Sequence, residues 1–541
     1  AVQVARTKGQ GLIRTRASVL SRCPRSPSPQ ARKLFCMAGE IRMFSTMTSS
    51  PPGAGLARSS NTGTSGFVKH HIKLDGGKQI TYEAFEGSME KPLIDKREYK
   101  LIRLENGLEA LLIHDPEADK ASAAMDVRVG HLSDPEGLYG MAHFCEHLLF
   151  MGTKKYPREN EYSEYLSNHS GSSNAFTSLE NTNYFFDVGY AHFEGALDRF
   201  AQFFLEPLFD PSCSEREIRA VDSEHKKNLQ SDLWRSFQLD KTLSNPSHPY
   251  SKFGTGNLAT LWEKPREMGL DIRDELLKFH ERYYSANMMK LVVLGRESTA
   301  KLTEWVAEKF SNVPNKQCDV PSFPGSPLSD RELGTQVLFR TIKDVRLLDI
   351  TFPFPEQADL YRSKPGQLLS HLIGHEGHGS LFSCLKQRGW ANLLSAGSAI
   401  HAKGFELFKI NIDLTHEGYE HYGDVVAAVF QYIDMLRAKP IEQWLYEEVQ
   451  RLSELRFIFK EKSSPAMYSS TLASQMQHSL PPEWLLSGPY VLREFDAPLI
   501  SSTLEYLRPD RCRLMLAGRE PPAGVSLDKS ETWYGTESVS Y

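Results

Sequence analysis

The sequence predicts an α+β protein built from two homologous α/β modules, each a mostly antiparallel sheet packed against helices. Three observations support this: strand-like apolar segments, longer segments with helical periodicity, and an internal repeat. The chain has 541 residues, enough for two to four domains, and 40% hydrophobic with 24% charged residues is typical of a globular protein. The net charge of −5 gives no reason to expect a nucleic-acid partner, and no apolar run reaches the roughly 18 residues of a membrane span.

Residues 1–77 are predicted to be a basic leader followed by a flexible linker. Residues 1–39 hold eight Lys or Arg and no Asp or Glu, which is typical of a mitochondrial transit peptide, although a disordered basic tail would have the same composition. Residues 48–66 are rich in Ser, Gly and Pro and indicate a linker. We therefore expect a cytoplasmic protein with an additional mitochondrial form arising from the leader.

Folded structure is expected from about residue 78. Two early segments show strand-like patterns, a later apolar run ends in a glycine turn, and two segments between them have helical character. The predicted strands are 108–115, 123–129 and 290–295, and the predicted helices are 141–151 and 214–230.

An offset of 223 residues relates two distant pairs of segments. It brings the strand ending at Gly295 onto one ending at Gly518, and MDVRV from residue 125 onto LDITF from residue 348. The repeat predicts a catalytic module at 78–320 and a homologous, non-catalytic module at 321–530. Chance similarity of two buried strands is the alternative.

The segment MAHFCEHLLFMGT (141–153) carries the chemistry. His143 and His147 are four residues apart, so on a helix they share one face and can bind one zinc ion, and Glu146 lies beside the same point. A hydrolytic zinc site has three protein ligands and a position for water, whose proton a nearby carboxylate removes. For the third ligand, the predicted helix at 214–230 offers Glu217 and Glu224, seven residues apart. A pair of surface histidines is the alternative.

A second histidine cluster lies in HLIGHEGHGS (371–380). His371 and His375 are again four residues apart, with His378 nearby. Three glycines in this segment break any helix, so the fixed histidine geometry of the first motif is lost. The pattern favours a Gly-rich turn that exposes backbone groups to a ligand over a second metal site.

The segment HFCEHLLFMGTKKYPRENEYSEYLSNHSGSSNAFTSLENTNYFFDV (143–187) resembles the insulysin-type zinc metallopeptidases of the pitrilysin family, which are inverzincins. The resemblance continues through VDSEHKKN, SKFGTGN, HLIGHEG and WYGT, and covers about residues 95–536. It implies one Zn²⁺ per chain held by His143, His147 and Glu224. Glu217 would support the site from nearby, and Glu146 would be the catalytic base.

The resemblance also implies two substrate-binding segments. At SSNAFTS (172–178) the substrate peptide would add as an extra strand beside the zinc, although Phe176 could instead belong to the core. HLIGHEG would form an exosite for the amino terminus of the substrate, where Glu376 meets the ammonium charge. The implied substrate-binding residues are Asn174, Ala175, Phe176, His371, Gly374, Glu376, Leu394, Ser395 and Ala396.

The implied function is hydrolysis of short unfolded or amyloid-prone peptides, such as insulin-like hormones. Full-length family members have four modules in two halves, so residues 531–541 would begin the linker between the halves. We therefore expect weak activity from this chain alone, and either self-association or pairing with a C-terminal half. The alternatives are a β-type subunit of a mitochondrial processing peptidase, and a zinc-loaded peptide-binding protein without turnover.

Overall fold

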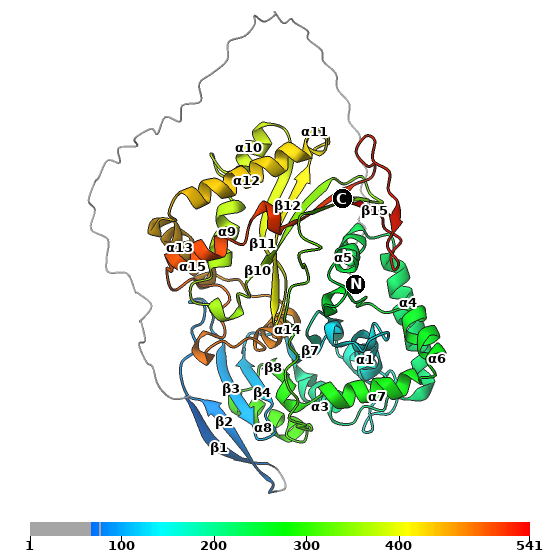
Figure 1. The fold of residues 1–541 in the computed structure, drawn as a ribbon. Helices are drawn as coiled ribbons and strands as arrows, with labels where there is room; N and C mark the ends of the chain where they lie inside the picture. Colours follow the sequence, from blue (N-terminus) through cyan, green and yellow to red (C-terminus); the bar gives the residue numbers. More distant parts are fainter. Residues whose placement is uncertain (1–65, 75–76) are drawn as a thin grey trace, which may run out of the picture. The chain divides into compact units, whose positions relative to one another are not determined.

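The computed structural model describes residues 66–74 and 77–541 (Figure 1). Most of the predicted leader and linker therefore lies outside the described residues. The prediction that linker continues to residue 77 is wrong at its end, because β1 (Phe67–Lys73) pairs along its whole length with β2 (Gln79–Phe85). The apolar side chain of Phe67 explains the difference, since its ring packs 5.9 Å from that of Phe85.

The first sheet has eight strands in the order β1-β2-β3-β4-β8-β5-β7-β6. All neighbours are antiparallel except β4 and β8, which are parallel. The strands after β2 are β3 (Glu98–Leu104), β4 (Glu109–His114), β5 (Lys120–Val127), β6 (Ser172–Thr177), β7 (Thr182–Gly189) and β8 (Met289–Gly295). The three predicted strands correspond to β4, β5 and β8.

The second sheet has seven strands in the order β11-β12-β10-β13-β9-β15-β14, and only β9 and β13 are parallel. Read from β11, the first five strands follow the order of the first sheet read from β6, which supports the predicted repeat, whereas β15 and β14 come from the end of the chain. The offset of 223 residues does not hold for every strand of the second sheet. Carried over from the pairing of β8 with β5, it would place Leu514 opposite Leu348, but Leu514 pairs with Ile350. The strands are β9 (Thr335–Arg340), β10 (Leu347–Phe354), β11 (Ala391–Ala402), β12 (Phe405–Leu414), β13 (Arg513–Gly518), β14 (Lys529–Ser530) and β15 (Glu537–Ser540).

Helices lie on both sheets. Those of the first half are α1 (Met141–Leu149), α2 (Glu161–Asn168), α3 (Phe193–Leu205), α4 (Pro211–Asn228), α5 (Asp232–Thr242), α6 (Lys264–Glu267), α7 (Ile272–Tyr283) and α8 (Thr299–Phe310). Those of the second half are α9 (Pro365–Ile373), α10 (Leu381–Gln387), α11 (His416–Glu420), α12 (Tyr422–Ala438), α13 (Gln443–Ile458), α14 (Pro465–Gln475) and α15 (Ala497–Leu504). The two predicted helices correspond to α1 and α4. Within the described residues, no helix is both long and apolar enough to cross a bilayer.

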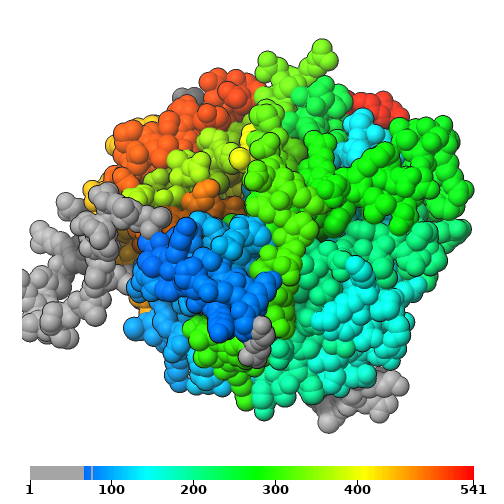
Figure 2. All heavy atoms as spheres, turned by 90° about the horizontal axis from the view of Figure 1, so that it is seen from below, coloured from blue at the N-terminus to red at the C-terminus, as the bar shows by residue number. Residues whose placement is uncertain are grey.

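Each sheet is covered on one face by a helix from the other half of the chain. In β8, Leu291 and Val293 join the core that includes α1, α3 and α8, whereas Val292 and Leu294 face a cluster containing residues of α14. Figure 2 shows the corresponding orange segment beside the blue N-terminal strands. Conversely, Leu239 of α5 packs under strands of the second sheet. The described residues accordingly belong to one compact unit.

The last residues belong to the second sheet. The prediction that 531–541 begin a linker is wrong, because β15 (Glu537–Ser540) pairs antiparallel with β9. Val539, which pairs with Leu338, is buried in the core of this sheet. The apolar side chain and the free sheet edge together hold this segment in place.

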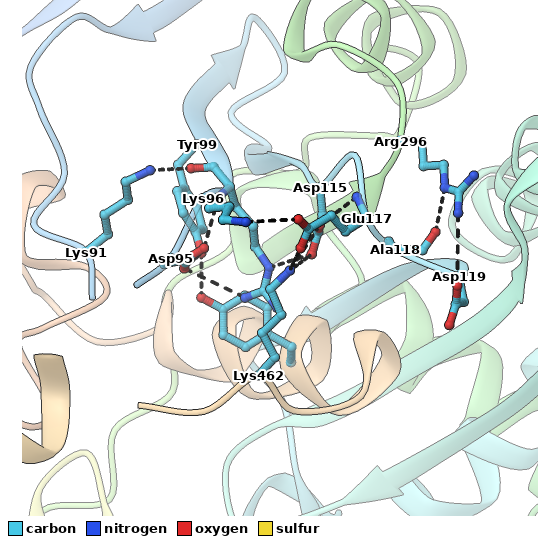
Figure 3. A network of polar contacts seen from close by, with 12 residues as sticks. Lys91, Asp95, Lys96, Tyr99, Asp115, Glu117, Ala118, Asp119, Arg296 and Lys462 are labelled. Carbon is cyan, nitrogen blue, oxygen red and sulfur yellow. Dashed lines mark hydrogen bonds and ion pairs between the residues drawn. The ribbon is translucent and has the colours of Figure 1, made fainter. Parts of the chain in front are cut away.

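A buried ionic network joins the connection before α14 to the first sheet (Figure 3). Arg97 donates to Asp115 at 2.9 Å, and the Nζ of Lys462 lies 3.1 Å from the same carboxylate and 3.4 Å from Glu117. Burial raises the pKa of Asp115, but Arg97 and Lys462 outweigh it and hold the pKa below its usual value. The carboxylate is therefore charged at neutral pH and stabilises the fold there.

We expect Asp115→Asn to lower the free energy of unfolding by about 2–4 kcal/mol at pH 7, because Arg97 loses the closer of its two buried counter-charges and keeps only Asp95 at 3.8 Å. Since the folded pKa is depressed, this stabilisation is present above the unfolded pKa of about 3.9 and is lost as pH falls through the folded value. Urea titrations at pH 7 and in acid measure the difference. Asp119→Asn, at a fully exposed carboxylate beside Arg296, is the matched control. An equal loss in both variants would contradict the role of the network.

Candidate metal centre

Helix α1 (Met141–Leu149) presents its polar side chains on one face because the other face is apolar. Phe144, Cys145 and Leu148 are fully buried in the core, which leaves His143 and His147 half-buried on the opposite side. The carboxylate of Asp134 accepts from the backbone N–H groups of Gly140 and Ala142 at 2.6 and 2.8 Å. This side chain satisfies the otherwise free amides at the start of the helix and fixes its position.

Three side chains from α1 and α4 converge at one point. The Nε2 of His143 lies 3.4 Å from one Glu224 oxygen, and the Nε2 of His147 lies 3.9 Å from the other. One nitrogen or oxygen from each of the three residues lies within 4.8 Å of the others. Within the described residues, this is the one group of three or more His, Cys, Asp or Glu side chains that could hold a metal ion.

Hydrogen bonds on the far side of each imidazole leave Nε2 free to ligate. The Nδ1 of His143 lies 2.7 Å from the carbonyl oxygen of Thr255, and the Nδ1 of His147 lies 3.3 Å from a Glu217 oxygen. Since a carbonyl and a carboxylate only accept, both Nδ1 atoms must carry a hydrogen, so Nε2 is the nitrogen that faces the other ligands and can bind a metal once it carries no proton. Glu217 thus contacts His147 as the resemblance implied.

The carboxylate of Glu146 lies buried beside the histidines. Its side chain accepts from the Oγ1 of Thr177 at 2.5 Å, which ties α1 to β6. Burial raises the pKa of Glu146, although the charges of the neighbouring histidines and the Thr177 hydroxyl oppose this. A carboxylate with a raised pKa next to a metal site is suited to accept a proton and to donate it again.

The edge strand β6 (Ser172–Thr177) runs beside this carboxylate. It pairs only with β7 within the described residues, so its outer backbone groups are available to a further strand. Asn174 and Phe176 point to the exposed face, whereas Ala175 packs partly against the core. The Phe176 side chain is 42% exposed, so the alternative that it belongs to the core is wrong.

Part of the predicted exosite lies at the edge strand β11, where Gly374 and Ala396 meet. A Cβ atom on Gly374 would lie 3.7 Å from the amide nitrogen of Ala396, which places the end of α9 against β11. His371 is half-buried, while Glu376 and Ser395 are exposed. Leu394 differs from the prediction: its side chain is 4% exposed and lies in the core, so only its backbone faces the edge.

Sequence reasoning missed Thr255, Thr177 and Asp134, which hold the ligands and the base. The Thr255 carbonyl reaches His143 because two glycines let the backbones approach closely: a Cβ on Gly140 would lie 2.2 Å from the Cα of Gly256. Both glycines also have positive φ, 89° and 78°. The motif SKFGTGN contained this signal, but a backbone carbonyl leaves no trace in residue identity.

Comparisons with known proteins agree with this geometry. Residues 109–247 match the model of Insulinase (Peptidase family M16), residues 271–453 the Peptidase M16 inactive domain, and residues 457–539 the middle or third domain of peptidase M16. The chain belongs to the insulinase family of peptidases. This family is one of zinc metallopeptidases, so a zinc ion is implied.

Several relatives of this family are similar to the chain. The human insulin-degrading enzyme is 52% identical over 82% of the chain, and the A-factor-processing enzyme of Saccharomyces cerevisiae is 47% identical over 84%. The crystal structure of pitrilysin matches 85% of the chain with a TM-score of 0.81 and 32% identity. A Helicobacter pylori protease shares the fold, with a TM-score of 0.60 and 18% identity over 79% of this chain and all of its own.

The chain spans less than half the length of the curated relatives that it matches. It covers 43% of the human enzyme, 44% of the yeast enzyme and 48% of pitrilysin. What those whole proteins do therefore enters as a proposal below.

We expect metal uptake by this site to release a proton at pH 7.5. Burial lowers the pKa of His143, but Glu224 and Glu146 outweigh it and raise the pKa to about 9 in the metal-free chain. A metal must displace this proton from Nε2, so the apparent affinity should rise about tenfold per pH unit up to pH 9. Calorimetric zinc titrations at pH 7.5, in two buffers of different ionisation enthalpy, count the protons. The contribution of His143 should disappear well above pH 9, leaving only the protons released by zinc-bound water, and a zero count at pH 7.5 would contradict the raised pKa.

Proposed function

We propose that this chain is the catalytic half of an insulysin-type zinc metalloendopeptidase. The observation that carries the proposal is the convergence of His143, His147 and Glu224 beside the buried carboxylate of Glu146 and the open edge of β6. Such a site can hold a metal, move a proton and bind an extended peptide. One zinc ion per chain is part of the proposal.

The donor set suits Zn²⁺. Two imidazole nitrogens and one carboxylate oxygen are ligands that catalytic zinc takes, and they leave a position for water. The chemistry that Zn²⁺ would supply when bound is Lewis acidity toward a water and toward the peptide carbonyl. Thr255 and Glu217 orient the two imidazoles for this task from their far sides.

Glu146 would serve as the proton carrier. Its burial and raised pKa favour accepting a proton from the attacking water, and the same carboxylic acid can then donate to the leaving amine. Thr177 keeps the carboxylate in place through its hydroxyl. General-base catalysis of this kind contributes about 10²–10⁴-fold to the rate.

Substrate would bind along the two sheet edges. A peptide paired with β6 would use main-chain hydrogen bonds, with Asn174, Ala175 and Phe176 beside its side chains. Its amino terminus would reach the exosite formed by His371, Gly374, Glu376 and β11 at Ser395 and Ala396. Main-chain pairing tolerates varied sequence and needs an extended chain, which supports short unfolded or amyloid-prone peptides, including insulin-like hormones, as substrates.

A cytoplasmic location with an additional mitochondrial form is also part of the proposal. The basic composition of residues 1–39 supports the mitochondrial form. Those residues lie outside the described part of the chain, and the proposal of a mitochondrial form rests on their composition.

We expect Glu146→Gln to keep zinc and to lose at least about 100-fold in kcat, because the amide holds the same space but cannot take a proton. Glu224→Gln should lose most of its zinc, because a ligand is removed. Elemental analysis and cleavage of a quenched fluorescent peptide measure the two effects. Glu215→Gln, at an exposed carboxylate on α4, the helix that carries Glu224, is the control. Zinc loss in Glu146→Gln as complete as in a histidine variant would show that ligand and base have been confused.

We also propose that the chain works with a C-terminal half or self-associates, because its matched part covers less than half of the length of the relatives. The chain alone should bind zinc and peptide but cleave insulin-sized peptides slowly, since positioning of the substrate contributes several kcal/mol to catalysis. Adding the separately expressed C-terminal half of a homologue should raise kcat/KM. Full activity of the isolated chain, unchanged by the addition, would contradict this expectation.

A further inference from the structure

A short turn near the end of the chain, residues 531–536, packs against the elements that support the metal ligands. In Figure 1 the red C-terminal segment runs beside α4 and α5. The turn is well ordered internally: the Glu531 carboxylate accepts from the backbone N–H groups of Trp533 and Tyr534 at 3.0 and 2.7 Å, and from the Thr242 hydroxyl at 3.1 Å. Gly535 closes it with a φ of 64°.

The turn contacts the loop that orients His143. The Trp533 ring stacks on Phe253 with a centroid distance of 4.4 Å and an interplanar angle of 7°. The Tyr534 hydroxyl lies 3.4 Å from the Oγ1 of Thr255, the residue whose carbonyl accepts from His143 Nδ1. The loop at 253–255 is thus held between the turn on one side and the ligand histidine on the other.

The turn also contacts the other two parts of the site. His225, which follows the ligand Glu224 in α4, donates from Nε2 to the Trp533 carbonyl at 3.0 Å. The Tyr139 ring, just before α1, meets the Trp533 ring edge-on at 6.4 Å. One residue, Trp533, therefore contacts the approach to α1, helix α4 and the Thr255 loop.

These contacts are more than general packing would require. They connect residues about 300 positions apart, and two of them end at His225, next to the ligand Glu224, and at Thr255, one hydrogen bond from the ligand His143. Arg235 adds a further tie by donating to the Tyr534 carbonyl at 2.7 Å. The β15 strand anchors the turn in the second sheet, so the second module reaches the metal site through it.

We infer that residues 531–536 act as a clip, in which Trp533 and Tyr534 are positioning residues that set the metal affinity of the site. The inference rests on the proposed function, since it assumes that His143, His147 and Glu224 hold zinc. By fixing the Thr255 loop and α4, the clip keeps the His143 imidazole and the Glu224 carboxylate turned toward one point. Loss of a group bonded directly to a metal ligand typically weakens binding about 10–100-fold, and because the clip supports such a group we expect an effect at the lower end of this range.

The test is zinc affinity and release rate in the full chain, measured by competition with a chromophoric chelator. Trp533→Ala should bind zinc at least about tenfold more weakly and release it faster, whereas Trp533→Phe, which keeps a ring on Phe253, should stay within about threefold of wild type. Trp444→Ala, at a tryptophan that is 56% exposed on α13, is the matched control and should be unchanged. The visible spectrum of the Co²⁺-loaded chain should change in Trp533→Ala and not in Trp444→Ala.

The possible failures can be told apart. A wild-type zinc affinity in folded Trp533→Ala, or the same loss in Trp444→Ala, would overturn the clip. If Trp533→Ala does not fold, Tyr534→Phe decides, since it removes only the hydroxyl near Thr255: faster zinc release supports the clip, and an unchanged rate overturns it. Absence of zinc uptake by the wild-type chain would overturn the proposed function and the clip together.

Discussion

The hydrogen bond from His143 Nδ1 to the Thr255 carbonyl is the constraint on which the site depends. It selects the tautomer whose Nε2 can ligate, and it requires the 253–257 loop to lie directly against the start of α1. That approach is possible only without side chains, which explains Gly140 and Gly256. A loop pressed against a helix start in this way has little secondary structure of its own. Its position must therefore come from packing against neighbouring elements.

The exchange of helices between the two halves supplies a rigid frame for that packing. Helix α14 covers the far face of the first sheet, and α5 lies under the second, so neither sheet has a complete core without the other half. The buried pair of Asp240 on α5 and Arg513 on β13 joins the halves at a point from which water is excluded. Breaking such a pair by removing one partner is costly, so this contact favours a single arrangement of the two halves.

The sequence alone was sufficient to predict the side chains of the metal site and the central strands, because both depend on the residue types at given spacings. The spacing of His143, Glu146 and His147, and the acidic residues of α4, predicted the donor set, and the alternation of apolar residues predicted the central strands. The first and the last strand of the fold, β1 and β15, were not predicted, each for a different reason. The strand β1 begins directly after the Ser, Gly and Pro rich segment 48–66 and was included in the linker, and β15, a short strand with a single buried valine, gave too weak a pattern. The role of Thr255 could not be read from its residue type, because its contribution is a backbone carbonyl, and the neighbouring glycines were its only trace in the sequence.

The two modules show how a duplicated fold can keep one property and lose another. Both retain an open strand at the same end of the sheet, β6 and β11, with a helix packed against it. In the first module, Glu146 of α1 reaches Thr177 of β6 through a hydrogen bond. In the second, Ser370 of α9 lies against Gly397 of β11, and its hydroxyl donates within its own helix to Gly366. Small residues at this contact bring helix and strand together, so the second edge lacks the buried carboxylate that Glu146 supplies in the first. The different chemistry of the two edges thus follows from the side chains at one helix–strand contact, on a common backbone arrangement.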